Sequence, residues 1–176
     1  MQSHHQHQEH PVFVADCIDA FIRKIGHLIA WVYVALILVI ITQVFLRKGL
    51  SSGLIILEEL QWHLYAVGVM FGMSYAQINN AHVRVDLIYG GLRIRTKRII
   101  DVLGILILVL PFIAVIFIHS LDFVADSWRI NESSDSPSGL PWRWAIKSVI
   151  PLSFGMLALA VISRLIRDVV LLFRGE

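Results

Sequence analysis

Residues 58–86 of the chain read EELQWHLYAVGVMFGMSYAQINNAHVRVD. Two adjacent carboxylates, Glu58 and Glu59, open a long run of apolar residues, and a polar cluster closes it. As a helix, residues 60–81 would extend about 33 Å, which is close to the thickness of the hydrocarbon core of a bilayer. The stretch therefore predicts a membrane helix with charged ends, and this prediction decides the fold class.

The composition of the whole chain also indicates a membrane protein. Of the 176 residues, 57% are hydrophobic, and the mean hydropathy is +0.72, whereas soluble domains have about 45–50% apolar residues. The net charge of +2 comes from basic residues clustered between apolar runs, which argues against a nucleic-acid-binding surface. The single cysteine, Cys17, excludes an internal disulfide and a CxxC motif.

Four apolar segments are long enough to cross a bilayer, so we expect an all-α integral membrane protein with four transmembrane helices. The spans are expected at about residues 26–46, 60–81, 102–121 and 146–165. Pro111 lies within the third span and predicts a kink near the carbonyl of Ile107. We expect residues 11–176 to form one membrane domain that follows a disordered His/Gln-rich tail at residues 1–10.

Residues 11–25 form an amphipathic segment ahead of the first span. Apolar residues recur every three or four positions, and Asp16, Asp19, Arg23 and Lys24 lie on the opposite face. Two interpretations stay open: the segment is an interfacial helix on the membrane surface, or it extends the first span. With the N-terminus inside, ten lysines and arginines face the cytoplasm and five face the other side, so both termini are expected to be cytoplasmic.

The two carboxylates of the opening stretch face different surfaces, because consecutive helical residues differ by about 100°. Glu58 lies on the same side as the small residues Gly68, Gly72 and Ala76, whose spacing lets two membrane helices approach closely. The helix that meets this stripe belongs either to this chain or to a second protein. We expect the following residues at a subunit interface: Glu58, Glu59, Trp62, Tyr65, Gly68, Gly72, Ala76, His82, Arg84 and Asp86.

Enzyme signatures are absent from the sequence. It contains no HExxH, P-loop, dinucleotide-binding or Ser/His/Asp motif, so we expect no catalytic residue, no metal site and no cofactor. A haem-binding anchor of a redox enzyme is an alternative, because antiparallel second and third spans would place His63 and His119 at similar depth. A small independent channel or carrier is a third interpretation, although four spans without an inverted repeat are few for it.

Four motifs follow one another in a specific order. They are Glu58-Glu59-Leu60, His82-Val83-Arg84-Val85-Asp86, Ser136-Pro137-Ser138-Gly139-Leu140-Pro141-Trp142 and Val149-Ile150-Pro151-Leu152. In this order the chain resembles DctQ, the small membrane subunit of tripartite ATP-independent periplasmic (TRAP) transporters, over about residues 25–167. The mannitol- or chloroaromatic-type subgroup is especially similar. The family often has a Trp just before the paired glutamates, where this chain has Leu57.

The resemblance implies a function in transport. The chain would be a small scaffold subunit of a sodium-coupled TRAP transporter in the bacterial inner membrane. Its partners would be a large elevator-type membrane subunit and a periplasmic substrate-binding protein, which together take up an organic anion. The substrate and sodium sites would belong to the large subunit, so we expect neither enzymatic activity nor independent transport from this chain.

Overall fold

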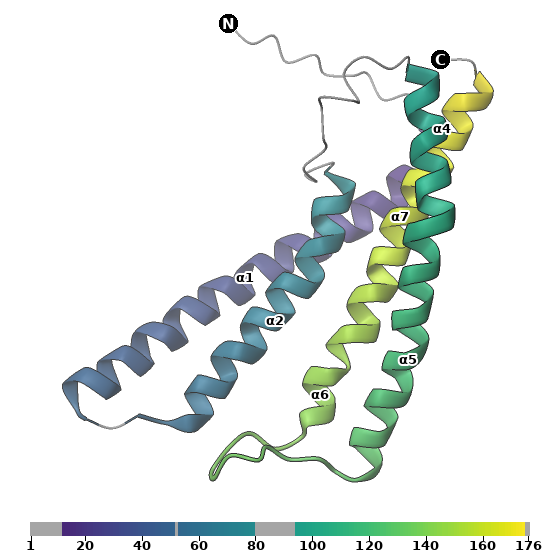
Figure 1. The fold of residues 1–176 in the computed structure, drawn as a ribbon. Helices are drawn as coiled ribbons and strands as arrows, with labels where there is room; N and C mark the ends of the chain where they lie inside the picture. The colour runs from purple at the N-terminus through teal and green to yellow at the C-terminus, as the bar shows by residue number, and fades with distance from the viewer. Residues whose placement is uncertain (1–11, 52, 80–93, 175–176) are drawn as a thin grey trace, which may run out of the picture.

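The computed structural model describes residues 12–51, 53–79 and 94–174 (Figure 1). In these ranges all regular structure is helical. The elements are α1 (Phe13–Gly49), α2 (Ile55–Ile78), α4 (Ile94–Gly104), the π-helical turn η1 (Ile105–Val109), α5 (Leu110–Arg129), α6 (Arg143–Lys147) and α7 (Val149–Arg174). Among the described residues, three helical segments are long and apolar enough to cross a membrane: Phe13–Gly49, Arg95–Arg129 and Arg143–Phe173.

These three segments contain the first, third and fourth expected spans and are suited to cross a membrane by length and composition. The second expected span corresponds to α2, which has 24 residues and is about 36 Å long. It is more polar than the others, since it contains Gln61, His63, Ser74 and Gln77, and it does not reach their hydropathy. The packing accounts for this difference: α1 and α7 cover much of α2, so many of its side chains contact protein rather than lipid.

α1 is one continuous helix of 37 residues. In it the amphipathic segment joins the first span without a break, as in the second of the two interpretations left open by the sequence. The helix is about 55 Å long, whereas the hydrocarbon core of a bilayer is about 30 Å thick. A large part of α1 therefore extends past its most apolar region, and this part packs on α7 through Ile22, which is completely buried beside Met156 and Ala160.

The third apolar segment changes its helical pattern where the proline predicts it. The turn η1 includes Ile107, and Pro111 follows it in the first turn of α5. Because proline has no backbone N–H, the Ile107 carbonyl lacks the donor that an α-helix would supply. A π-helical turn is one of the local adjustments that membrane helices make at such positions.

α7 is the central helix of the bundle. It packs against α1, α2, α4 and α5, and Figure 1 shows it between α2 and α5. In its most apolar window 39% of the residues are buried inside the protein, compared with 11% in each of the other two candidate spans. Ser153, Ala160 and Ser163 are almost inaccessible, and such small residues let membrane helices approach closely.

α1 and α2 run antiparallel (Figure 1) and meet through two reciprocal contacts. The ring of Tyr33 on α1 covers Gly68 on α2, and the ring of Tyr75 on α2 covers Gly26 on α1. In each helix the glycine precedes the tyrosine by seven residues, which is about two helical turns. Part of the small-residue stripe on α2 therefore packs within this chain.

Candidate functional site

We call the end of the bundle that contains residues 50–54 and 130–142 the loop end (Figure 1). Here Glu59, on the first turns of α2, reaches the loop that precedes α6. Its carboxylate accepts a hydrogen bond from the Ser134 hydroxyl and another, at 2.6 Å, from the backbone N–H of Leu140. Gly139 fits closely beside it, since a Cβ there would lie 2.8 Å from Glu59 Oε1. Glu59 thus fastens the loop to α2.

Glu58 points to a different part of the chain. It accepts a hydrogen bond of 3.2 Å from Gln43 Nε2 on α1 and lies 3.7 Å from Arg47 Nη1. Gln43 is 5% exposed, and its Oε1 accepts a hydrogen bond from the N–H of Leu54. The two adjacent carboxylates therefore contact different surfaces, as the helical wheel predicts, and both of these contacts lie within the chain.

A second group of charges closes the same loop. Glu132 accepts a hydrogen bond from Lys147 Nζ, and Arg143 Nη1 lies 3.9 Å from the other carboxylate oxygen. The Lys147 ammonium also lies 4.0 Å from the centre of the Phe123 ring, a cation–π contact. The pKa of Glu132 is held below its ordinary value, mainly by the hydrogen bond from Lys147. These contacts favour the ionised form of Glu132 and connect the loop to α5 and α6.

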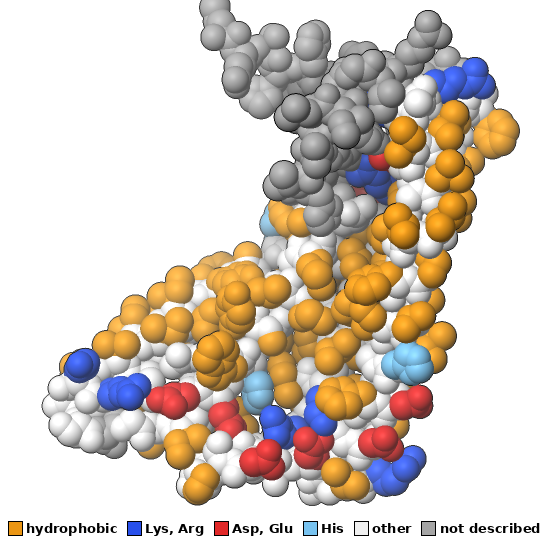
Figure 2. Space-filling view, in the orientation of Figure 1, with side chains coloured by type: hydrophobic (Ala, Val, Ile, Leu, Met, Phe, Trp, Pro, Cys, Tyr) orange, Lys and Arg blue, Asp and Glu red, His pale blue; other side chains and the backbone are white. Residues whose placement is uncertain are grey.

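One face of α2 is left uncovered by the helices that the structure describes. Trp62, Tyr65 and Val69 are 72%, 52% and 40% exposed, and a Cβ at Gly72 would meet nothing within 4 Å. These four residues recur at steps of three and four, so they share one helical face. We call them the α2 strip. Figure 2 shows one face of the molecule, with hydrophobic side chains over the middle of the helices and charged ones at the loop end.

The structure separates residues that the sequence grouped together. Gly68 faces Tyr33 inside the chain, while Gly72 faces open space on the α2 strip. Ala76 is partly buried, one turn further along. The remaining expected interface residues, His82, Arg84 and Asp86, lie outside the described residues.

The haem alternative is not supported by the geometry. It requires His63 and His119 to face each other across the second and third spans, but α7 lies between α2 and α5. His63 is partly buried on α2, and His119 is exposed on α5. Within the described ranges, no group of three or more His, Cys, Asp or Glu side chains is placed to hold a metal ion.

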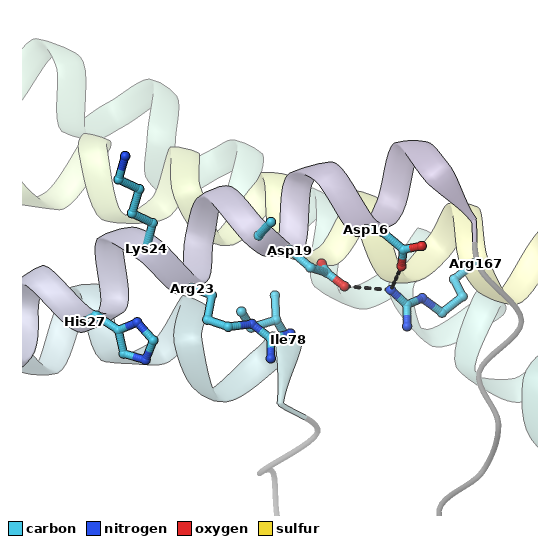
Figure 3. Close-up of a pocket in the computed structure, with 8 residues that line it drawn as sticks. Asp16, Asp19, Arg23, Lys24, His27, Ile78 and Arg167 are labelled. Carbon is cyan, nitrogen blue, oxygen red and sulfur yellow. Dashed lines mark hydrogen bonds and ion pairs between the residues drawn. The ribbon is translucent and has the colours of Figure 1, made fainter.

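The opposite end of the bundle, where α1 begins and α7 ends, contains a network of charges that the sequence did not predict. We call it the terminal end. Arg167 Nη2 donates hydrogen bonds of 3.0 Å to Asp16 and 2.7 Å to Asp19 (Figure 3). The Ser163 hydroxyl donates a further hydrogen bond of 2.6 Å to Asp19. The Arg167 and Asp19 side chains are only 16% and 13% exposed, so the pair is largely shielded from water.

A second ion pair continues this network towards α4. Arg164 on α7 donates a hydrogen bond of 2.9 Å to Asp101 and lies 3.6 Å from Asp168. The signal for the network was present in the sequence, because the acids just before the first expected span and the bases at the end of the fourth fall on the same expected side of the membrane. The sequence alone does not show that these acids and bases pair with one another across the helices.

Comparison with known protein families gives a match over residues 36–171, to the family described as tripartite ATP-independent periplasmic transporters, DctQ component. The matched region is more than half of the chain. It includes α2, the loop of residues 130–142 before α6, and nearly all of α7. No curated protein and no solved structure matches the chain. The match is to the family as a whole and does not select a subgroup.

Proposed function

We propose, from the premise that this chain belongs to the DctQ family, that it is a scaffold subunit whose α2 strip docks on the large membrane subunit. Membership makes the chain the small membrane component of a TRAP transporter rather than an enzyme. At the level of the family, this component works with a large membrane subunit and a periplasmic substrate-binding protein.

The exposed aromatic residues of α2 support the docking role. Trp62 and Tyr65 lie on a helix that α1 and α7 otherwise largely cover, and aromatic residues are enriched where proteins meet. Gly72 leaves room beside them, so the backbone of another helix can approach closely. A helix of the large subunit that packs along the α2 strip would bury α2 on all sides, which suits its moderate hydropathy.

The proposed placement in the membrane also depends on α2 being a transmembrane helix. We propose that α2 also crosses the membrane, which makes four spans in all, and that both termini lie in the cytoplasm, which puts the loop end on the periplasmic side of the bacterial inner membrane. The antiparallel arrangement of α1 and α2 and the distribution of lysine and arginine support this orientation. Sodium coupling, an organic anion as substrate and an elevator-type large subunit are proposed on the resemblance to the family alone.

Contacts at both ends of the bundle support a static role. Glu59 joins α2 to the loop before α6 at the loop end, and Arg167 joins α7 to α1 at the terminal end. Reciprocal tyrosine–glycine contacts fix α1 against α2 between these two ends. A bundle held in this way can serve as a fixed support for a moving partner.

A matched pair of tryptophans tests the docking surface. Trp62 on α2 is 72% exposed, and Trp31 on α1 is 71% exposed. We expect Trp62→Ala to weaken association with the co-expressed large subunit at least tenfold, roughly the loss typical of a tryptophan hot spot, as measured by co-purification and titration in detergent. Trp31→Ala should leave association unchanged. Equal effects of the two variants would exclude the α2 strip as the docking surface.

A further inference from the structure

A pocket of about 430 Å³ opens at the terminal end, between α1, Ile78 at the end of α2, and Arg167 on α7 (Figure 3). The side chains of α1 that line it include two acids, Asp16 and Asp19, and two bases, Arg23 and Lys24. His27 completes the α1 side of the pocket. With a neutral histidine, the five charged side chains give the pocket a net charge of +1.

The acids and bases of this pocket are in different situations. Asp16 and Asp19 both accept hydrogen bonds from Arg167, which balances one of their two negative charges. In the part of the chain that the structure describes, Arg23 and Lys24 form no ion pair. Figure 3 shows Arg23 extending on the side of Ile78, while Lys24 projects away from it. Arg23 is therefore the guanidinium that remains available to an anion in the pocket.

The depth of the pocket matches the headgroup layer of a membrane. The apolar run of α1 begins at Leu28, five residues after Arg23, which is about 7 Å along the helix axis. The hydrocarbon core accounts for about 30 Å of a bilayer that is about 40–45 Å thick with its headgroups, so a guanidinium at this distance reaches the phosphate level. Phe21 and Leu28, which are 54% and 69% exposed, offer apolar surface nearby.

We propose that this pocket binds the phosphodiester headgroup of a phospholipid, with Arg23 as its principal ligand. The forked guanidinium donates two hydrogen bonds in the geometry that phosphate oxygens accept. A singly charged phosphodiester balances the net charge of the pocket, and basic pockets between membrane helices are known sites for acidic headgroups. Lys24 strengthens the positive field, while the acyl chains lie along the exposed apolar side chains of α1.

Native mass spectrometry of the purified full-length chain in neutral detergent tests the proposal, with phosphatidylglycerol as the probe. The variant is Arg23→Ala/Lys24→Ala, and the matched control is Arg47→Ala/Lys48→Ala, which removes an adjacent basic pair from the other end of α1. We expect the first variant to bind one lipid about tenfold more weakly, because it loses charge-assisted hydrogen bonds. The control should change binding less than twofold.

Two further probes identify what is recognised. Diacylglycerol has the acyl chains without the phosphodiester, and glycerol phosphate has a phosphate without the chains. Both should bind far more weakly than phosphatidylglycerol. Equal loss of lipid in the two double variants, binding of diacylglycerol as tight as that of phosphatidylglycerol, or equally tight binding of glycerol phosphate would each overturn the proposal. Circular dichroism of each variant checks that the helices are intact.

Discussion

The phenol ring of Tyr33 occupies the space that any side chain at Gly68 would need: a Cβ at Gly68 would lie 2.5 Å from Tyr33 Cζ. The same relationship is repeated in reverse between Tyr75 and Gly26. Because the two contacts run in opposite directions, sliding α2 along α1 would break both at once. The pair of contacts therefore sets the register of the α1/α2 hairpin.

Gly68→Leu should destabilise the chain, because the tyrosine must leave its position or the helices must separate. We expect a loss of about 1–3 kcal/mol, the usual cost of overpacking a filled contact, measured by thermal unfolding in detergent. Gly104→Leu is the control, since a Cβ at Gly104 meets nothing within 4 Å and leucine favours a helix more than glycine does. Equal stability of the two variants would show that the Tyr33 contact does not constrain the hairpin.

Gly72→Leu should separate folding from assembly. A side chain at this position meets open space within the chain, so the thermal stability of the isolated subunit should equal that of Gly104→Leu. Association with the large subunit should fall, because the added side chain fills the place into which a partner helix packs. Co-purification of the two variants with the large subunit measures the difference. Undiminished association of Gly72→Leu would remove this glycine from the interface.

Glu59→Gln should loosen the loop before α6. The carboxylate accepts from two donors, Ser134 and the N–H of Leu140, and a neutral amide accepts such bonds more weakly. Hydrogen exchange at the Leu140 amide should become several times faster. Glu58→Gln is the control, because its ion pair with Arg47 is half exposed and exposed pairs contribute little. An unchanged exchange rate in Glu59→Gln would mean that other contacts hold the loop.

Arg167→Ala should destabilise the terminal end. The variant leaves Asp16 and Asp19 without their guanidinium, and Asp19 is 13% exposed. We expect a loss of about 2 kcal/mol, less than the about 3–5 kcal/mol for a fully buried pair. Arg129→Ala removes a pair with Asp126 in which both side chains are more than two thirds exposed, so it should cost almost nothing. Chemical unfolding of both variants compares them directly, and equal midpoints would contradict the prediction.

The closure of the loop should depend on pH through Glu132. Its pKa is below the ordinary value of 4.5, so the contact with Lys147 stabilises the folded loop above that value. The stabilisation is lost as the pH falls through the lowered pKa and the carboxylate becomes protonated. The protection of residues 131–142 against hydrogen exchange, measured relative to the intrinsic rate at each pH, should fall below about pH 4.5. Glu132→Gln should show the reduced protection at every pH, and wild-type protection that does not change with acid would refute this role.

Hydropathy predicted the membrane class and the apolar part of three long helices, but these helices extend beyond the expected spans. The apolar run that begins near residue 26 marks the part of α1 suited to hydrocarbon, whereas the helix itself begins at Phe13. The additional turns are stabilised by packing on α7, through Ile22 and Met156, and single-sequence patterns do not contain such contacts. α2 was found from its charged start and small residues rather than from hydropathy alone.

The candidate site was predictable in part. The helical wheel correctly assigned Glu58 and Glu59 to different surfaces, because that depends only on helix geometry. The partners of Glu59 lie 75 and 81 residues further along the chain, and one of them is a backbone amide that has no sequence signature. The haem alternative assumed that His63 and His119 face each other, and the structure does not support this. The order of helices in space, with α7 in the middle, does not follow from their order in the sequence.

The fastenings at the two ends of the bundle have a mechanical consequence. Two helical hairpins that were connected at only one end could move apart and together at the other end. Here Glu59 holds one end and Arg167 holds the other, so neither end is free to swing. With the proposed scaffold role, a large subunit that moves against this chain would displace the bundle as one rigid body rather than bend it.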